Sequence, residues 1–487
     1  MTAAAILTRG LGMVYRVLLA RFLGAEGLGL YQMLFPFFIA LVTLSVAGTP
    51  VAISQMVADD RVNPLTLLRR ARAIVLVITI PLAVVVVVAA RPIVMHLYHD
   101  PRFVPLLLLL SPALLAIAFS SVLRGFFLGQ QQMTIPSLAQ VVEQLLRVFL
   151  LIFLLYFAKS HLLQNRIAVA TALVPLGEGV SLFILAVGFY QWHRQLVHEP
   201  PPASVASRRL VSYRAILRMS LPIMFGRLLG SLLGVIEATL IPRQLRHHGF
   251  TEVQAVAYFG RLSGMALPLI LFPTALTVAL SSNLIPAIAR AKASEDTSTV
   301  ARLIQESLSA TAYLTVPVTA ILILMGTSLD DWLFHGNLAP TVFIPLTIGA
   351  FFLYFDIAFA GILRGLGRTD IPLKNDLLSG AIEVVMIIGF ASPEGLSAAI
   401  AAGFISSWWL NLKATTKLTG VPLNWPRILA KPTLASLPLI LTIPAWQRFS
   451  LNHHLNRPVE LTMALALASA VYLVTLRLTG FRWSRLV

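Results

Sequence analysis

The sequence contains no cysteine, which excludes disulfide bonds, thiolate metal sites and cysteine nucleophiles together. Charged residues are also scarce, at 12%, whereas a soluble globular domain carries about a quarter. Acidic residues are the scarcer kind, with 20 Asp and Glu against 37 Lys and Arg. Nucleophile elbows, P-loops and HExxH motifs are missing. We therefore expect no enzyme of these classes, no cofactor and no metal site.

What the sequence has instead is apolar residues. They make up 57% of the chain, and the mean hydropathy is +0.84, which places the protein in a lipid bilayer. The net charge of +17 could suggest a nucleic-acid partner, but the basic residues are separated by hydrophobic runs long enough to cross a membrane. We therefore expect the protein to contact the lipid bilayer and not nucleic acid. We also expect it to be a monomer.

Hydrophobic runs predict an all-α integral membrane protein with about fourteen transmembrane helices, since each crossing needs about 20 mostly apolar residues. The expected spans are 4–22, 28–57, 73–97, 103–123, 134–158, 167–192, 215–241, 254–289, 303–327, 341–363, 375–391, 395–412, 432–447 and 460–476.

The distribution of basic residues predicts the orientation. Most of the 37 Lys and Arg residues fall in connections that share one side of the membrane with both chain ends. Because cytoplasmic loops carry the excess of Lys and Arg, we expect both termini to be cytoplasmic. The expected location is the bacterial cytoplasmic membrane, which the chain crosses many times.

A repeated phrase indicates an internal duplication. Leu-Arg-Gly occurs at Leu123 and at Leu363, 240 residues apart, and each copy is followed by Ile-Pro. A second pair of similar segments, at 51–60 and 285–296, has nearly the same offset. Copies this long are typical of transporters, and six spans in each copy imply lobes related by a pseudo-two-fold axis along the membrane normal. The expected regions are an N-terminal lobe at 1–195, a cytoplasmic linker at 196–212, a C-terminal lobe at 213–420, and two further helices with the tail at 421–487.

Several arginines fall inside the predicted spans. An arginine at mid-bilayer depth costs at least about 2.5 to 3.5 kcal/mol on insertion scales, so it should face a wet cavity or a partner. Arg9 and Arg16 are seven residues apart and share one face of the first helix. Arg227 and Arg261 have apolar sequence on both sides, which favours a cavity. Snorkelling of the long side chains to the membrane surfaces is the alternative.

The acidic residues within spans divide into two kinds. Glu143 and Arg147 have the i, i+4 spacing of a salt bridge along one helix, so a structural pair is expected. Glu237 and Asp356 have no basic neighbour at that spacing. They are candidates for binding a coupling cation or a proton, with a partner from another helix as the alternative.

One family resemblance covers most of the chain. The opening segment, with Arg9 and Arg16 in it, resembles the stage V sporulation protein B branch of the MOP exporter superfamily, which is related to MurJ lipid II flippases. The matching segments are Thr8–Gly12, Ala20–Gln32, Ala47–Ser54, Tyr258–Gly264, Leu280–Ala287 and Gly361–Gly367.

The resemblance implies a two-lobed flippase. Such a protein moves a polyprenyl-pyrophosphate-linked saccharide from the inner to the outer leaflet by alternating access, through a central cavity lined by arginines. The motif match assigns Arg9, Arg16 and Arg261 to that cavity. The second-helix basic pair of MurJ-type proteins has no counterpart in the uncharged stretch from Phe37 to Thr49, so lipid II is not singled out as the cargo.

Two other functions fit parts of the sequence. A cation-coupled multidrug exporter of the MATE type would share the fold, but its cationic substrates favour acidic rather than basic cavity residues. A membrane glycosyltransferase or polysaccharide polymerase would need a sizeable outer loop, and the predicted outer loops are short. A scaffold without transport would leave the arginines within the spans unexplained.

Overall fold

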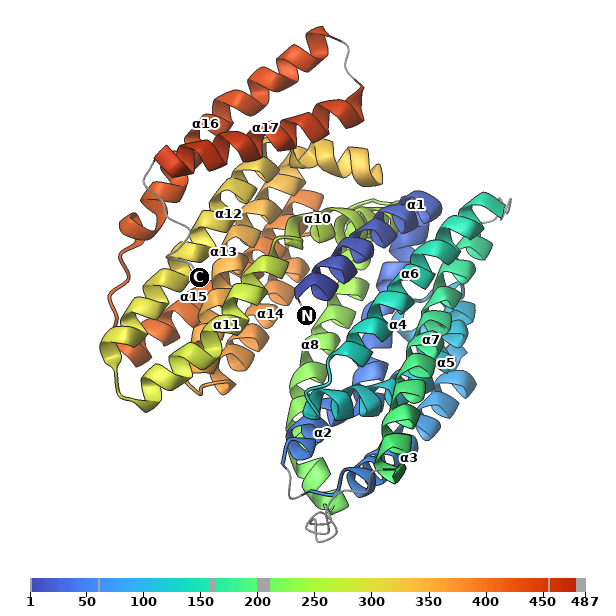
Figure 1. Cartoon of the computed structure of the whole chain (residues 1–487). Coiled ribbons are helices and arrows are strands. Elements are labelled where there is room, and N and C mark those ends of the chain that lie inside the picture. The colour runs from blue at the N-terminus through green and yellow to red at the C-terminus, as the bar shows by residue number, and fades with distance from the viewer. Residues whose placement is uncertain (1, 60–61, 158–162, 199–210, 454–455, 479–487) are drawn as a thin grey trace. The chain divides into compact units, whose positions relative to one another are not determined.

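The computed structural model describes residues 2–59, 62–157, 163–198, 211–453 and 456–478, which form helices joined by short turns, with no β-strand among them (Figure 1). In chain order the helices are α1 (Thr2–Val46), α2 (Thr49–Val57), α3 (Pro64–Val88), α4 (Ala90–Leu97), α5 (Phe103–Gly129), α6 (Thr134–Phe157), α7 (Leu163–His198), α8 (Tyr213–His247), α9 (Glu252–Phe259), the π-helix η2 (Gly260–Ala266), α10 (Leu267–Leu271), α11 (Thr274–Ala293), α12 (Thr297–Phe334), α13 (Pro340–Gly365), α14 (Asp370–Gly389), α15 (Pro393–Thr419), α16 (Trp425–Asn452) and α17 (Arg457–Leu478).

Twelve helical segments of the described residues are long and apolar enough to cross a membrane, which confirms an all-α membrane fold. The first, Leu7–Val57, has 51 residues and would be about 75 Å long if straight, more than twice a hydrocarbon core of about 30 Å. Gly24 breaks it with φ 67° and ψ −177°, a conformation open to glycine, so this segment supplies two crossings. With α14, a 20-residue helix that contains four charged residues, the crossings agree with the fourteen predicted.

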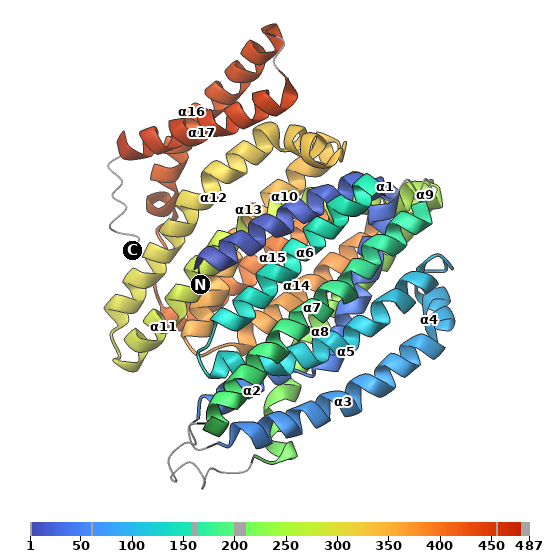
Figure 2. The same cartoon turned by 45° about the vertical axis from the view of Figure 1, so that its right-hand side comes forward.

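The chain forms two compact units, and the same packing recurs inside each. The N-terminal unit is Met1–Thr239 with Val256–Gly260, and the C-terminal unit is Leu240–Ala255 with Arg261–Val487. In the first unit α5 packs against α2, α3 and α7, and α3 lies alongside α5 (Figure 2). In the second unit α13 packs against α11, α12 and α15. The predicted linker lies largely outside the described residues, and the predicted region boundaries stay predictions.

Two glycines explain why the Leu-Arg-Gly phrase recurs. A Cβ on Gly125 of α5 would lie 2.7 Å from the carbonyl oxygen of Pro50 on α2. A Cβ on Gly365 of α13 would lie 3.1 Å from the carbonyl oxygen of Ile285 on α11. Each glycine therefore lets two helices approach until backbone meets backbone, as small residues do in membrane helix packing. The two similar pairs of segments in the sequence thus form the same helix contact in each unit.

Several breaks within the predicted spans have local causes. Gly48 adopts φ 70° between α1 and α2, where its Cα lies against the backbone of Ser220. Pro92 cannot donate to the carbonyl of Val88, and the helix ends there before resuming as α4. Pro273 similarly separates α10 from α11. The spans predicted at 28–57, 73–97 and 254–289 are therefore interrupted helices.

The last two helices form a hairpin in the C-terminal unit. They run side by side in both views (Figures 1 and 2), and the indole Nε1 of Trp446 on α16 donates to the carbonyl of Glu460 on α17 at 3.0 Å. Both helices also pack against α12, so the pair extends this unit beyond the duplicated helices.

We expect Gly125→Ala to lower the melting temperature of the detergent-purified protein. The added methyl group must displace the backbone of α2, and overpacking of this kind costs typically about 1–3 kcal/mol. Gly10→Ala is the matched control, because a Cβ there meets nothing within 4 Å. Equal melting temperatures for the two variants would show that the close contact at Gly125 is not needed.

Candidate functional site

Arg9 and Arg16 lie on the first part of α1, before the break at Gly24, and both side chains are exposed. Seven residues of helix place them about 10 Å apart along the axis and on nearly the same face. Among the described residues neither makes a hydrogen bond or an ion pair. The first crossing therefore presents two unneutralised guanidinium groups on one face.

Other basic side chains of the N-terminal unit are neutralised in a buried cluster. Arg147 Nη2 lies 2.8 Å from Glu143 Oε1, which confirms the predicted i, i+4 salt bridge on α6, and 3.2 Å from Glu178 Oε1 on α7. Arg124 of α5 joins at 3.3 Å from Glu143 Oε2 and donates to the Ser181 hydroxyl at 2.7 Å. Two arginines thus face two glutamates, and the cluster is balanced in charge.

Two buried tyrosines connect this cluster to the first helix. Tyr15 and Tyr31 are each 8% exposed and lie on the two parts of α1. The charges of Arg16 and Arg147 both act on the Tyr31 hydroxyl. A polar region therefore extends from the free Arg16 to the neutralised Arg147 within one unit.

Helix α8 holds two further predicted site residues. Arg227 is exposed and Glu237 is partly buried, and neither makes a hydrogen bond or an ion pair among the described residues. They are ten positions apart in sequence, which corresponds to about 15 Å of helix, so they do not form a pair with each other. Both belong to the part of α8 that lies in the N-terminal unit.

Arg261 lies in the π-helix η2 of the chain. Such widened turns are rare and frequently occur at functional sites. Asp330, near the end of α12, is fully buried, and the backbone N–H of Leu338 acts on its carboxylate. The charge of Arg261 acts on this carboxylate within the C-terminal unit. Arg261 is therefore partly compensated, unlike Arg9 and Arg16.

Asp356 on α13 lies in a network of neutral donors. Asn411 Nδ2 donates to Asp356 Oδ1 at 2.7 Å, and the Ser407 hydroxyl lies 3.0 Å from Oδ2. The same hydroxyl lies 3.1 Å from Asp376 Oδ1, and Asn375 Nδ2 donates to Asn411 Oδ1 at 2.8 Å. Three helices of the C-terminal unit thus gather two carboxylates with amide and hydroxyl groups. No group of three or more His, Cys, Asp or Glu suited to a metal ion occurs in the described residues.

The two polar clusters occupy equivalent places in the two units. Ser181 and Ser407 lie at the centre of each cluster, on α7 and α15, and Arg124 and Arg364 stand 240 residues apart on α5 and α13. The first cluster balances arginines with glutamates, whereas the second is built around Asp356 and holds no ion pair to it. The duplicated units thus have a polar cluster at the same position, but the charged residues in the two clusters differ.

Sequence reasoning missed Asp330, Asp376, Ser407 and Asn411. Asp330 lies just beyond the span predicted to end at 327, so it was not counted among the acids within the membrane. Ser407 and Asn411 carry a usable signal, because their i, i+4 spacing puts two hydrogen-bonding groups on one face of a membrane helix.

We expect Arg147→Ala to destabilise the protein strongly, because it leaves Glu143 and Glu178 as buried acids facing only Arg124. Removing one partner of a buried ion pair costs about 3–5 kcal/mol. Adding Glu143→Gln should restore part of the loss, since one uncompensated charge disappears. Melting temperatures of the two variants and of Arg218→Ala, an exposed residue without a partner, test this. A double variant no more stable than Arg147→Ala would contradict a charge-balanced cluster.

Comparisons with known proteins agree with this architecture. Residues 1–292 match the polysaccharide biosynthesis protein family. Stage V sporulation protein B of Bacillus subtilis (strain 168) is 27% identical over 433 residues, covering 87% of this chain and 83% of that protein. Lipid II flippase MurJ of the same organism is 22% identical, covering 84% and 79%. A solved structure of lipid II flippase MurJ in an inward closed conformation covers 97% of each chain at a TM-score of 0.70 and 16% identity, a likeness of fold. The chain thus belongs to the polysaccharide biosynthesis protein family, whose model covers more than half of it.

Proposed function

We propose that this protein is a flippase that moves a polyprenyl-pyrophosphate-linked saccharide from the inner to the outer leaflet of a bacterial cytoplasmic membrane by alternating access. The observation that carries the proposal is the pair of unneutralised arginines on the first helix, Arg9 and Arg16. The family description, which concerns polysaccharide biosynthesis, and the relative named lipid II flippase support the same class of cargo.

The physical argument rests on the cost of moving a pyrophosphate through a bilayer. Water is excluded from the hydrocarbon region, so the phosphate charge needs fixed positive groups on the protein. Arginine is always charged, and its planar fork of donors matches phosphate oxygens. The polyprenyl chain can stay in lipid, so only the head group needs a polar path.

The contrast within the N-terminal unit strengthens the assignment. Arg124 and Arg147 have carboxylate partners, which fits a structural role. Arg9 and Arg16 have none, and their exposure leaves them open to an anionic substrate. Arg227 is a third exposed candidate, and Arg261 is a fourth whose charge Asp330 partly offsets. The arginine-lined central cavity expected from the sequence stays a prediction.

A MATE-type exporter of cationic drugs is the second candidate that the fold admits. Unpaired guanidinium groups would repel a cationic drug at low dielectric, where charges interact far more strongly than in water. An acidic face on the first helix would favour that function, and this helix has no acid before Gly24.

We expect the rate of flipping to fall in the order native, Arg16→Lys, Arg16→Ala and Arg16→Glu. Lysine keeps the charge and loses the fork, alanine loses both, and glutamate repels the phosphate. The same order should hold at Arg9. The measurement is the transfer of a fluorescent polyprenyl-pyrophosphate disaccharide in proteoliposomes, normalised to inserted protein.

Arg246→Ala is the matched control for this series, because Arg246 is exposed in the last turn of α8 and its side chain has no hydrogen-bond or ion-pair partner among the described residues. Its rate should equal the native rate. Normal flipping by inserted Arg9→Glu and Arg16→Glu proteins would refute the cationic-site mechanism. Transport of a cationic dye by the native protein without transport of the lipid would favour the drug exporter.

A coupling cation or a proton is proposed at Asp356. Carboxylate and hydroxyl oxygens are ligands that hard cations prefer, and the Ser407 hydroxyl lies within 3.1 Å of both Asp356 Oδ2 and Asp376 Oδ1. Glu237 is the second candidate, because it is a partly buried acid that forms no ion pair within the described part of the chain.

We expect Asp356→Asn to abolish the response of flipping to an imposed Na⁺ or proton gradient, since the amide is neutral at every pH. Flipping rates with each gradient, in native and variant proteoliposomes, measure this. Glu237→Gln tests the second candidate in the same assay. Asp370→Asn is the control, because Asp370 lies at the first residue of α14 and pairs with Arg368 at 3.1 Å. An unchanged response in Asp356→Asn would remove Asp356 from coupling.

A further inference from the structure

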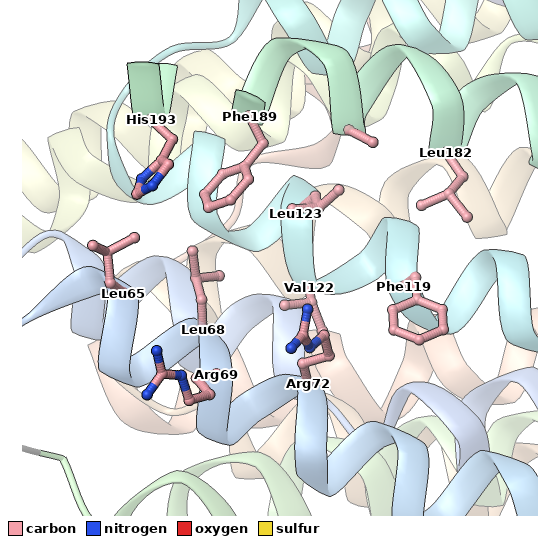
Figure 3. A pocket seen from close by; sticks show the side chains of 11 residues that line it. Leu65, Leu68, Arg69, Arg72, Phe119, Val122, Leu123, Leu182, Phe189 and His193 are labelled. Carbon is pink, nitrogen blue, oxygen red and sulfur yellow. The ribbon is translucent and has the colours of Figure 1, made fainter. Parts of the chain in front are cut away.

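The N-terminal unit has a cavity whose lining does not include the charged residues of the Arg124 and Arg147 cluster. It has a volume of about 550 Å³ and is bounded by α3, α5 and α7 (Figure 3). Its wall is mostly apolar, with Leu68, Phe119 and Leu182 among the side chains, and it also carries three basic groups: Arg69 and Arg72 on α3 and His193 on α7.

The two arginines are free to bind an anion. Both are exposed, and neither has a hydrogen bond or an ion pair among the described residues. Their spacing is i, i+3, so they share a face of α3. Arg70, between them, is engaged elsewhere: it donates to the Val211 carbonyl and lies over the Tyr213 ring. Of these three arginines, only Arg69 and Arg72, which line the cavity, have side chains without a partner among the described residues.

Basic residues and apolar residues lie toward opposite ends of the cavity, along the direction of the helices. Arg69 and Arg72 lie within about 12 Å of the start of α3, and His193 lies close to the end of α7. In Figure 3 His193 and Leu65 lie toward one end of the cavity, while Phe119 and Leu182 lie toward the other. Basic groups therefore gather at the helix ends that the sequence predicts to be cytoplasmic, and apolar side chains continue deeper into the membrane.

In the C-terminal unit, an aromatic side chain of the protein itself occupies the equivalent place. Offsets of 240 and 226 residues, set by Arg124/Arg364 and Ser181/Ser407, pair Phe119 with Phe359 and Leu182 with Trp408. There the first residue of α16, Trp425, inserts its ring 6.4 Å from Phe359 and 6.1 Å from Trp408.

We propose that this cavity binds an anionic glycerophospholipid of the surrounding leaflet, with the phosphate at Arg69, Arg72 and His193 and an acyl chain along Phe119 and Leu182. Its volume falls in the usual range for ligand pockets, about 300–1,000 Å³. Basic pockets between transmembrane helices at the cytoplasmic side are suited to anionic head groups. The lipid takes the place that Trp425 occupies in the other unit.

Native mass spectrometry of the detergent-purified full chain, titrated with phosphatidylglycerol or phosphatidylcholine, tests the proposal. We expect the native protein to retain phosphatidylglycerol preferentially. R69Q/R72Q should lower that affinity about tenfold or more, because two interfacial arginines are lost. R290Q/R302Q is the matched control: it removes the same charge from exposed residues outside the cavity and should bind as the native protein does.

L182W tests the cavity itself, since it imitates Trp408 and keeps every charge. It should lose the bound lipid, and A186F, at an exposed position of the wall, should do the same if L182W does not fold. Elution as a single species and native helicity confirm folding. Native-like binding by either the folded cavity variants or R69Q/R72Q overturns the proposal. Tighter binding of a polyprenyl phosphate than of phosphatidylglycerol, sensitive to the same variants, also overturns it.

Discussion

The structure depends on one constraint: a charged side chain inside a bilayer must be paired with an opposite charge, hydrated, or available to bind a charged substrate. Of the arginines within the spans of the N-terminal unit, Arg147 meets the constraint by pairing, with two glutamates within 3.2 Å. Arg9 and Arg16 do not pair, and they remain exposed on the first crossing. Because an unpaired arginine at mid-bilayer depth is costly, we propose that these two arginines bind a charged substrate. The assignment of function follows from this division between paired and unpaired arginines.

The duplication lets each unit serve as a reference for the other. Both units place a serine at the centre of a three-helix polar cluster, yet Arg124 binds Ser181 where Asp356 and Asp376 bind Ser407. Both also leave a space beside this cluster, which Trp425 fills in one unit and no described residue fills in the other. A duplicated fold can thus take different charges and different occupants at equivalent places while the helix packing stays the same.

Much of the fold could be predicted because its signals are local. Hydrophobic runs located most of the helices, although three predicted spans are interrupted. The i, i+4 spacing of Glu143 and Arg147 gave their salt bridge, and the repeated Leu-Arg-Gly phrase marked a close helix contact in each unit. Each of these depends on residues near one another in sequence, or on a pattern that occurs twice. The i, i+4 rule follows from helix geometry alone, so it can be applied to a sequence before any tertiary contact is known.

The parts that could not be predicted depend on contacts between distant residues. Arg124 joins its cluster from another helix, and the partners of Asp356 come from 51 and 55 residues further along the chain. Asp330 was overlooked because helix α12 continues past the end of the hydrophobic run. Hydrophobicity sets which segments lie in the membrane, whereas the register of neighbouring helices decides which polar side chains meet.

The central claim is that Arg9 and Arg16 hold the pyrophosphate of a lipid-linked saccharide. The most direct measurement is a structure of the full chain bound to a polyprenyl-pyrophosphate saccharide in lipid nanodiscs. The account predicts phosphate oxygens within hydrogen-bonding distance, about 2.7–2.9 Å, of at least one of these guanidinium groups. A bound pyrophosphate that contacts neither arginine would contradict it.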